Sequence, residues 1–246
     1  MIMVSPTGAR LTKADHPAVP ITIAEIVETT VECAAAGAEA LHLHIRDREG
    51  RHSLDAGLYA EALTAIDQAL PDFLVQITTE SAGRYGPDDQ CTLLEKLAPK
   101  WASISLREVA QDHDLARRIY AICHDSGTSI QHIVYTSQDA ETLRMWQTEG
   151  VLGRDESVIL VLGSYANARA ARPTDLAPLL RSLPPVDRWM VCAFGPTEHA
   201  CLHHAARFGG DLRVGFENST TNDEGIPWPN VQSSVLALLE CIDQTA

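Results

Sequence analysis

The chain has 246 residues, of which 45% are hydrophobic and 21% charged, as expected for a globular protein large enough to bury a core. Its formal net charge of −14 argues against a nucleic acid or an anionic membrane surface as partner, although a few local arginines could still hold an anionic small molecule. No apolar run approaches the roughly 20 residues of a membrane span.

Cysteine usage and the first residues bear on the cellular compartment. The six cysteines are scattered through apolar segments, which is typical of reduced core residues rather than of disulfides or a zinc knuckle. Residues 1–6 lack the basic region and the long apolar core of a signal peptide. We therefore expect a cytoplasmic protein.

Short apolar strands alternate with amphipathic helices along the whole chain. The strands are predicted at residues 2–4, 40–47, 73–80, 101–108, 129–135, 158–163, 189–194 and 212–217. The helices are predicted at residues 22–37, 58–70, 88–97, 114–125, 139–149, 174–183, 197–208 and 230–242. Thr22 and Glu25 have the spacing of a capping box at the start of the first helix.

Eight strand–helix units predict one domain over residues 1–246, a closed (β/α)₈ barrel of the TIM type. The alternative is a doubly wound open sheet, but no G-x-G-x-x-G motif follows the first strand and no P-loop occurs. In such barrels the active site lies at the C-terminal ends of the strands. We therefore expect the functional side chains at those ends.

Residues 40–47 (ALHLHIRD) hold the strongest candidate for a metal site. Because successive side chains of a strand point to opposite sides, His42 and His44 share one face and could both reach one ion. A pair of buried, hydrogen-bonded histidines is the alternative. Glu217 ends the last strand, which only the first strand separates from residues 40–47 in a closed barrel. These three residues form a His₂Glu set with an open position, as in catalytic zinc sites, although other divalent ions also accept it.

Further polar residues collect at the same end of the predicted barrel, and each has a structural alternative. Thr78 and Ser103 could bind a substrate, or they could only satisfy backbone groups at the strand ends. Glu80 and Glu108 could act on a substrate, or they could be charges on the rim.

Two pairs of residues likewise have both a functional and a structural interpretation. Arg46 could contact a substrate, or it could form a structural ion pair with Asp47. His199 and His203 lie four residues apart on a predicted helix and could chelate a metal, but without a converging carboxylate a solvated helix face is the better prediction.

Several segments, in order over nearly the whole chain, match the pattern of a known family. They are Thr7-Gly8-Ala9, residues 17–26, Ala36-Gly37-Ala38, the stretch His42-Leu43-His44-Ile45-Arg46, Gln76-Ile77, Leu162-Gly163 and Arg213-Val214-Gly215-Phe216-Glu217-Asn218. With these segments the sequence resembles the β-keto acid cleavage enzymes, the family that includes 3-keto-5-aminohexanoate cleavage enzyme. The order and spread of the segments make the resemblance more specific than any single motif.

The resemblance implies a zinc-bearing (β/α)₈ barrel that catalyses a retro-Claisen exchange. A β-keto acid and acetyl-CoA become acetoacetate and a new acyl-CoA. The resemblance also implies a homodimer or homotetramer. It places zinc ligands at His42, His44 and Glu217, hydroxyls that hold the substrate carboxylate at Thr78 and Ser103, and an active-site arginine at Arg213.

The sequence departs from the family where members carry acids or glycines. Asn218 stands where members have an aspartate after the metal-binding glutamate, Ile133 where a glutamate is expected, and Arg10 where the first loop has an acid. Glu80-Ser81 replaces a Gly-Gly pair, and Tyr165-Ala166-Asn167 replaces small, glycine-rich residues.

The chain lacks these family acids but carries two new ones at the same end of the predicted barrel. The amide of Asn218 cannot accept a proton at useful pH, whereas Glu80 and Glu108 are new carboxylates at the correct end of the barrel. We expect one of the two to act as the base, and Arg10 or Arg107 to change the substrate specificity.

Three functions follow from the sequence. The leading one is zinc-dependent acyl transfer between a β-keto acid and acetyl-CoA. The second is a metal-dependent lyase or hydrolase of a carbonyl substrate without CoA, which the altered residues 165–167 keep open. The third is a catalytically inactive barrel that binds a metabolite, which Asn218 and Ile133 favour and the retained metal ligands disfavour.

Overall fold

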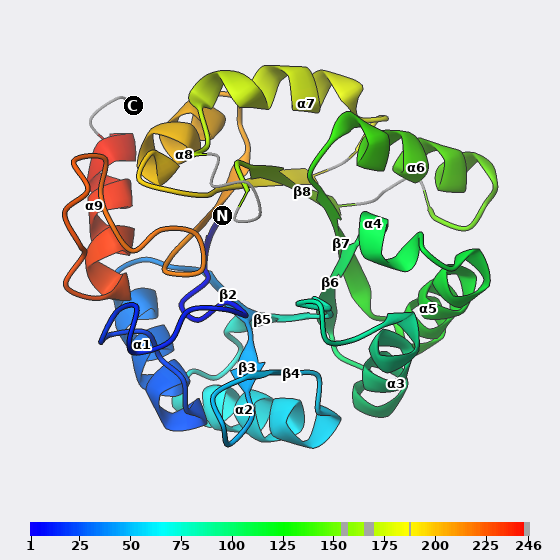
Figure 1. The fold of residues 1–246 in the computed structure, drawn as a ribbon, viewed down its shortest axis with the longest axis horizontal. Helices are drawn as coiled ribbons and strands as arrows, with labels where there is room; N and C mark the ends of the chain where they lie inside the picture. Colours follow the sequence, from blue (N-terminus) through cyan, green and yellow to red (C-terminus); the bar gives the residue numbers. More distant parts are fainter. Residues whose placement is uncertain (154–156, 165–169, 187, 244–246) are drawn as a thin grey trace.

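Eight parallel strands close into a barrel in the computed structural model, which describes residues 1–153, 157–164, 170–186 and 188–243. Around the barrel β10 pairs with β1 and closes the sheet (Figure 1). The predicted (β/α)₈ barrel is therefore confirmed. In barrel order the strands are β1 (Ile2–Val4), β2 (Ala40–Leu43), β5 (Leu74–Thr78), β6 (Trp101–Ser105), β7 (Ser129–Val134), β8 (Ser157–Leu162), β9 (Arg188–Ala193) and β10 (Asp211–Val214).

Helices surround the barrel and cover the outer face of its sheet (Figure 1). The capping box predicted for the first helix is present, because the Thr22 hydroxyl accepts the N–H of Glu25 and the Glu25 carboxylate accepts the N–H of Thr22. The helices are α1 (Ile23–Ala35), α2 (Ala56–Ala69), α3 (Pro87–Leu97), α4 (Leu106–Val109), α5 (His113–Ser126), α6 (Ser137–Thr148), the 3₁₀ helix η1 (Pro173–Asp175), α7 (Leu176–Ser182), α8 (Glu198–Ala206) and α9 (Val231–Asp243).

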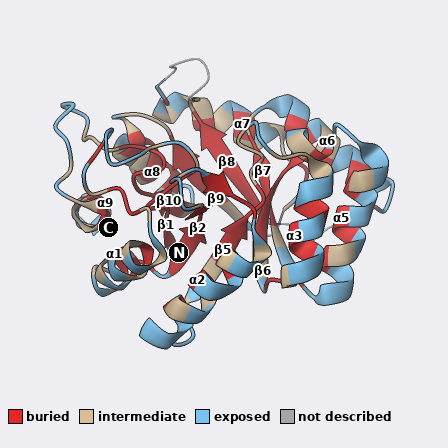
Figure 2. Ribbon diagram, turned by 60° about the horizontal axis from the view of Figure 1, so that its bottom comes forward, coloured by how far each residue is buried: buried red, intermediate tan, exposed pale blue. Residues whose placement is uncertain are grey.

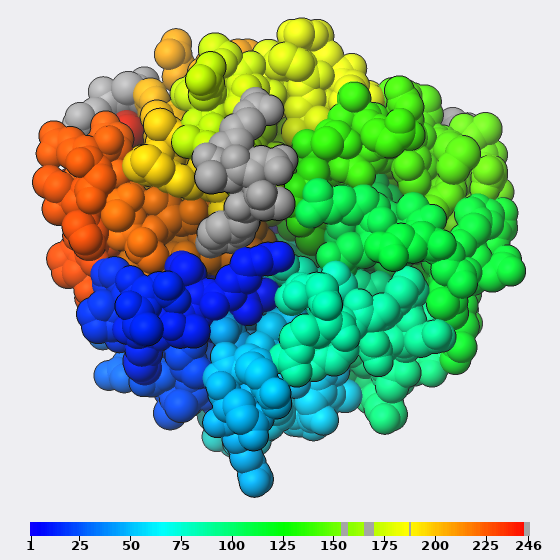
Figure 3. Space-filling view, viewed as in Figure 1, coloured from blue at the N-terminus to red at the C-terminus, as the bar shows by residue number. Residues whose placement is uncertain are grey.

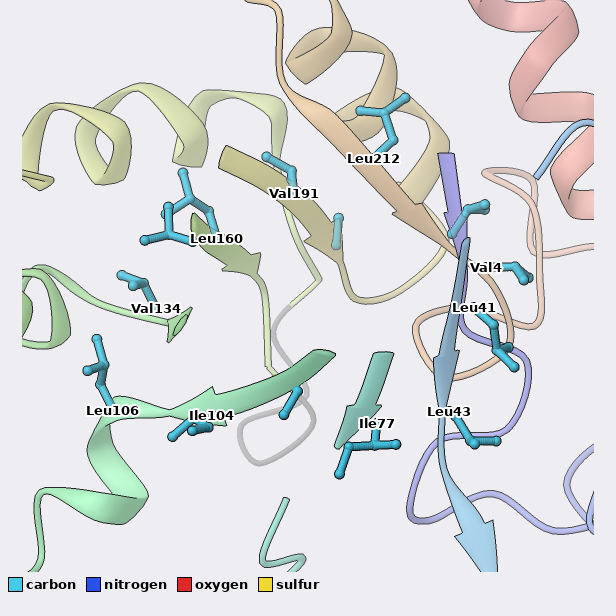
Figure 4. Close-up of a cluster of buried hydrophobic side chains, with 14 of the residues drawn as sticks. Val4, Leu41, Leu43, Ile77, Ile104, Leu106, Val134, Leu160, Val191 and Leu212 are labelled. Atoms are coloured by element: carbon cyan, nitrogen blue, oxygen red, sulfur yellow. The ribbon is translucent and has the colours of Figure 1, made fainter. Parts of the chain in front are cut away.

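The alternation of side chains along the strands divides the core into two layers. Figure 2 shows the strands buried and the helices exposed mainly on their outer sides. Outward-facing strand residues such as Leu41, Ile77 and Leu160 pack between sheet and helices (Figure 4). The inner layer consists of Met3, Ala40, Ile133, Ile159, Val161, Met190 and Cys192. The barrel interior is thus a packed core.

The segment predicted as one strand over residues 40–47 is two elements. β2 ends at Leu43, and Ile45–Arg46 forms β3, which pairs antiparallel with β4 (His52–Ser53). The Asp47 carbonyl accepts the N–H of Gly50, which turns the chain back. His44 therefore lies at the junction between the barrel and this small hairpin.

Two other predicted strands end early. β6 stops at Ser105, and residues 106–109 form the helical turn α4, in which Leu106 and Val109 are fully buried. β10 stops at Val214 because Gly215 has a φ of 143°, which places the following residues in a turn rather than a strand. Arg107 and Glu108 thus lie on a helix, and Glu217 and Asn218 lie on a loop.

The structure also shows the state of the cysteines and the character of the helices. All six cysteines lie in the described segments and none forms a disulfide. None of the helices in the described ranges is long and apolar enough to cross a membrane.

Candidate metal centre and active site

Three residues predicted as metal ligands converge at the C-terminal end of the barrel. The Nε2 atoms of His42 and His44 lie 3.7 and 3.4 Å from Oε2 of Glu217. One ligand atom from each residue lies within 4.8 Å of the other two, and all three side chains are buried. The geometry brings together groups that are 175 positions apart in sequence (217 − 42) because β10 and β2 both pair with β1.

A chain of amides orients His42. Its Nδ1 lies 2.7 Å from Oε1 of Gln76, whose Nε2 donates to Oε1 of Gln131 at 3.1 Å. Because Gln76 presents an acceptor oxygen, Nδ1 of His42 carries the proton and Nε2 keeps its lone pair. Hydrogen bonds of this kind fix the tautomer and ring orientation of metal-binding histidines.

The charge states also suit a cation. Burial lowers the pKa of His42 to about 3, so its ring is neutral at neutral pH. Burial alone would raise the pKa of Glu217, but the Arg213 guanidinium, 2.9 Å from Oε1, lowers it below its usual range, with smaller contributions from His42 and His44. The site therefore offers neutral nitrogen and a carboxylate anion.

His44 supplies the test of whether a metal fits. Neither of its ring nitrogens has a well-oriented hydrogen bond to a described residue, although the ring is buried. An unsatisfied buried polar group costs about 1–3 kcal/mol. A divalent cation bound between His42, His44 and Glu217 would satisfy Nε2 of His44, and the His₂Glu donor set suits zinc with an open coordination position. The residues present therefore fit a metal ion.

Main-chain contacts hold this side of the barrel in place. Arg46, which is buried, donates to the carbonyls of Thr7, Gly8, Leu11 and Gly50. Its guanidinium is thus occupied by the loop after β1. Asp47 instead pairs with Arg51, at 3.0 Å, so the alternative of an Arg46–Asp47 ion pair is wrong.

Gly8 and Gly215 allow the loops after β1 and β10 to approach each other. A Cβ on Gly8 would lie 2.7 Å from Cγ of Glu217, and a Cβ on Gly215 would lie 2.5 Å from the carbonyl oxygen of Ser5. Both glycines also have a positive φ. Only glycine fits this close backbone contact, which fixes the position of Glu217.

The two candidate acids have different surroundings. Glu80 lines the pocket, with Oε1 accepting from Arg10 at 2.9 Å and Oε2 lying 3.8 Å from Nε2 of His44. The Thr78 hydroxyl accepts the backbone N–H of Glu80, and Nε2 of His52 donates to its carbonyl. Figure 3 shows the dark blue loop after β1 against the teal segment after β5, where this ion pair lies.

Glu108 points into the protein instead. Its Oε1 accepts from the Ser81 hydroxyl, and its Oε2 accepts from the backbone N–H of Ser81 and from Nε2 of Gln90. Burial raises the pKa of its carboxyl above the usual value. Glu108 is absent from the described residues that line the pocket.

The pocket above the metal ligands has a cavity volume of about 80 Å³ and opens to solvent at its mouth. Across the barrel from β1 and β2 lies a mainly apolar surface, which we call the β6–β9 wall. It consists of Arg107, Ile133, Tyr135, Val161 and Phe194. Thr78 and Arg213 also line the pocket, with Arg213 donating to Sγ of Cys192 at 3.3 Å.

Some predicted site residues lie outside the pocket surface formed by the described residues. The Ser103 hydroxyl donates to the Ile77 carbonyl at 3.5 Å, and Oδ1 of Asn218 accepts from the Ser5 hydroxyl at 3.0 Å. Residues 165–167, which the sequence singled out, lie outside the described residues.

Two findings go beyond the sequence expectations. Gln76 was not predicted to support His42, although its inward position two residues before Thr78 is a usable signal. His199 is not on a solvated face: its ring stacks on Trp228, and its Nε2 lies 3.0 Å from the Ser234 hydroxyl.

Comparison with known proteins gives a consistent result. Residues 1–245 match the family described as beta-keto acid cleavage enzyme. A 3-keto-5-aminohexanoate cleavage enzyme of Fusobacterium nucleatum subsp. nucleatum is 27% identical over 228 residues, which cover 89% of this chain and 82% of that protein. A 3-oxoadipate:acetyl-CoA acetyltransferase of Cupriavidus necator is 27% identical over 260 residues, which cover 98% of this chain and 88% of that protein.

A similar barrel occurs among solved structures. A ternary complex of ObcA with a C4-CoA adduct and oxalate has a TM-score of 0.73 and 17% sequence identity over 91% of this chain. The chain spans 63% of the length of that ObcA chain. At this identity the likeness shows the fold alone.

Proposed function

This chain belongs to the β-keto acid cleavage enzyme family, and we propose that it transfers an acyl group between a β-keto acid and acetyl-CoA. In this reaction the C2–C3 bond of the β-keto acid breaks. Its C1–C2 unit joins the acetyl carbonyl carbon to give acetoacetate, and the CoA thiolate takes the remaining acyl group. Both the Cupriavidus relative, named for acetyl-CoA, and the family match support this choice.

The observation that carries the proposal is the convergence of His42, His44 and Glu217 beside the pocket, with neither ring nitrogen of His44 in a well-oriented hydrogen bond to a described residue. These three residues would hold a divalent cation, for which we favour zinc. Such an ion would polarise the keto oxygen of the substrate as a Lewis acid.

The carboxylate end of the substrate belongs near Thr78. Its Oγ1 accepts the N–H of Glu80 and is therefore free to donate its own proton to an anion in the pocket. Ser103 on β6 pairs in register with Thr78 on β5 and would help to hold Thr78 in position. Arg213 adds positive charge, which favours an anionic substrate even while it pairs with Glu217.

We assign proton transfer at C2 of the substrate to Glu80. It combines a pocket-facing carboxylate with a backbone held at both its N–H and its carbonyl. Glu108 has both oxygens occupied by Ser81 and Gln90, so we assign it the role of fixing the loop that carries Glu80. Asn218 would hold the loop after β1 through Ser5.

The side chains of Arg46 and Arg10 then have supporting roles. Arg46 fixes the loop after β1 through backbone carbonyls, and Arg10 orients the carboxylate of Glu80. The homodimer or homotetramer and the cytoplasmic location stay predictions, the first of which light scattering of the purified protein would test.

A turnover assay on zinc-loaded protein tests the proposal. We expect acetoacetate and a new acyl-CoA from a β-keto acid only when acetyl-CoA is present. Cleavage of the keto acid without acetyl-CoA would indicate a lyase or hydrolase instead. No turnover of any β-keto acid by metal-loaded protein, over a panel of neutral, cationic and anionic side chains, would favour the inactive barrel.

The panel must vary the far end of the substrate. The names of the two relatives given above indicate an amino group on the substrate of one and a second carboxylate on the substrate of the other. The panel therefore tests whether this pocket recognises the charge at the far end of the substrate.

A further inference from the structure

Three arginines line the pocket, and only two of them are paired with a carboxylate among the described residues. Arg213 lies 2.9 Å from Oε1 of Glu217, and Arg10 lies 2.9 Å from Oε1 of Glu80. Arg107 makes no ion pair with a described residue; its guanidinium carbon lies 3.5 Å from the centre of the Tyr135 ring. Among the described residues, Arg107 is thus the pocket arginine without an anionic partner.

The position of Arg107 is built by its surroundings. Its neighbours Leu106 and Val109 are fully buried, and Glu108 is anchored on Ser81 and Gln90, so α4 cannot easily turn. Arg107 is exposed, but stacking on Tyr135 holds its guanidinium flat. A stacked guanidinium keeps its N–H edge available, and that edge matches the two oxygens of a carboxylate.

Tyr135 is itself held in place. Its backbone N–H donates to Oδ2 of Asp139, which also accepts the N–H of Thr136 at the start of α6. The side chain then stands at the end of β7 and forms a platform for Arg107. The platform lowers the entropy cost of fixing a long side chain around a ligand.

The rest of the β6–β9 wall is apolar. Ile133, Val161 and Phe194 line the pocket there, and Leu11 lines it from the loop after β1. A ligand that suits this surface has an apolar spacer between two anionic ends, one near Thr78 and one at Arg107. On the basis of the proposed function, we infer that Arg107 binds a second carboxylate at the far end of the substrate, so that this chain cleaves β-keto dicarboxylic acids.

The phosphates of CoA are the other source of anionic oxygens at the pocket mouth. They would contact Arg107 only while the thioester is bound, whereas a substrate carboxylate would contact it without CoA. Binding measured without CoA therefore separates the two sources.

The first experiment is calorimetric titration of the zinc-loaded protein with two inert analogues, hexanedioate and hexanoate. We expect hexanedioate to bind about 10- to 100-fold more tightly, as a charge-assisted hydrogen-bonded pair allows, and Arg107→Gln to remove that preference. Arg117→Gln removes an equal charge from the outer helix α5, where Arg117 pairs with Glu149, and serves as the control. Equal binding of both analogues by the wild-type protein would overturn the inference.

The second experiment compares turnover of 3-oxohexanedioate and 3-oxohexanoate. Arg107→Gln should lower kcat/KM for the dicarboxylate about 10- to 100-fold, mainly through KM, and change the value for the monocarboxylate less than about twofold. Tyr135→Phe should keep the preference, because its ring still supports the guanidinium, and Tyr135→Leu should weaken it. No effect of Arg107→Gln on either substrate would overturn the inference and leave the family reaction standing.

Two further outcomes separate the inference from the proposed function. If Arg107→Gln raised KM for acetyl-CoA but not for acetyl-pantetheine, which lacks the CoA phosphates, Arg107 would serve the cofactor and the inference would be wrong. If hexanedioate bound in an Arg107-dependent way but no keto acid reacted with acetyl-CoA, the proposed reaction would fail while dicarboxylate binding at Arg107 stood.

Discussion

The two sides of the barrel mouth differ in how their side chains are held. On the side of β1, β2 and β10, which we call the metal side, Arg46 is bonded to four backbone carbonyls and Gly8 lies against Glu217. On the β6–β9 wall, Arg107 is exposed and is held by a ring contact with Tyr135. Backbone groups contact the site residues directly on the first side, whereas a contact between two side chains holds Arg107 on the second.

This difference teaches how one barrel can keep a reaction and change its substrate. A Cβ on Gly8 would displace Glu217, the proposed metal ligand, whereas we expect the exposed Arg107 to be replaceable with the barrel intact. We therefore expect substitutions on the metal side to abolish the reaction and those on the β6–β9 wall to change its substrate. The following substitutions test that division, from the largest expected effect to the smallest.

Removing two ligands should have the largest effect. The double substitution His42→Ala/His44→Ala should abolish zinc binding and lower turnover at least about 1,000-fold, because the Lewis acid is lost. Metal analysis of dialysed protein and the acetoacetate assay measure these effects. His113→Ala, on the exposed face of α5, is the control and should retain full metal content. Zinc retained by the double variant would place the metal elsewhere.

Glu80→Gln and Glu108→Gln separate the two acids. We expect Glu80→Gln to lower kcat about 100- to 10,000-fold with its zinc content unchanged, because a general base is lost. Glu108→Gln should lower kcat much less and lower the free energy of unfolding by about 1–3 kcal/mol, because a half-buried carboxyl that accepts several hydrogen bonds is altered. Wild-type turnover in both variants would show that neither Glu80 nor Glu108 is the base.

Gly8→Ala should weaken the metal site without removing a ligand. The new Cβ would lie 2.7 Å from Cγ of Glu217 and displace it, so we expect zinc affinity to fall about 10- to 100-fold. Gly83→Ala is the matched control: its φ of 72° is also positive, but no atom lies within 4 Å of the added Cβ. It should lower only the free energy of unfolding, by about 1–2 kcal/mol. Equal zinc affinity in both variants would contradict the fixed geometry of the metal side.

The smallest effect is expected from a carboxylate that belongs to neither side. Burial would raise the pKa of Glu25, but hydrogen bonds from Lys13, Thr22 and Ile21 lower it to about 2, below the usual 4.5. The carboxylate therefore stabilises the folded state above about pH 4.5, and this contribution is lost as the pH falls toward 2.

Denaturation of Glu25→Gln at several pH values measures that contribution. Since the side chain is partly exposed, we expect a loss of only about 0.5 kcal/mol at pH 7, which shrinks below pH 4.5, with turnover unchanged. A difference that grows as the pH falls would contradict stabilisation of the folded state by the ionised carboxylate.

The sequence predicted the metal side better than the β6–β9 wall, for a physical reason. Strand alternation predicts His42 and His44 on one face, and barrel closure brings Glu217 beside them, so one local pattern and one topology rule suffice. The helical turn α4 was not predicted, because residues 101–108 continue an alternating pattern and the turn depends on burial of Leu106 and Val109 in the folded protein.

The sequence also could not distinguish the roles of the two acids, Glu80 and Glu108. Glu80 and Glu108 follow neighbouring strands and look alike in sequence. Only the fold directs Glu108 toward Ser81 and Gln90 and leaves Glu80 beside Arg10 in the pocket. The stacking of Arg107 on Tyr135 likewise depends on where α4 places the guanidinium.

The most direct test of the central claim is the fate of a carbon label. Zinc-loaded protein is incubated with a β-keto acid and acetyl-CoA that carries ¹³C in both acetyl carbons, and the products are analysed by NMR. We expect the label at C3 and C4 of acetoacetate, with C1 and C2 unlabelled and the acyl group of the keto acid on CoA. Label that stays in acetyl-CoA, or appears as free acetate while the keto acid is cleaved, would contradict acyl exchange and indicate a reaction without acetyl transfer.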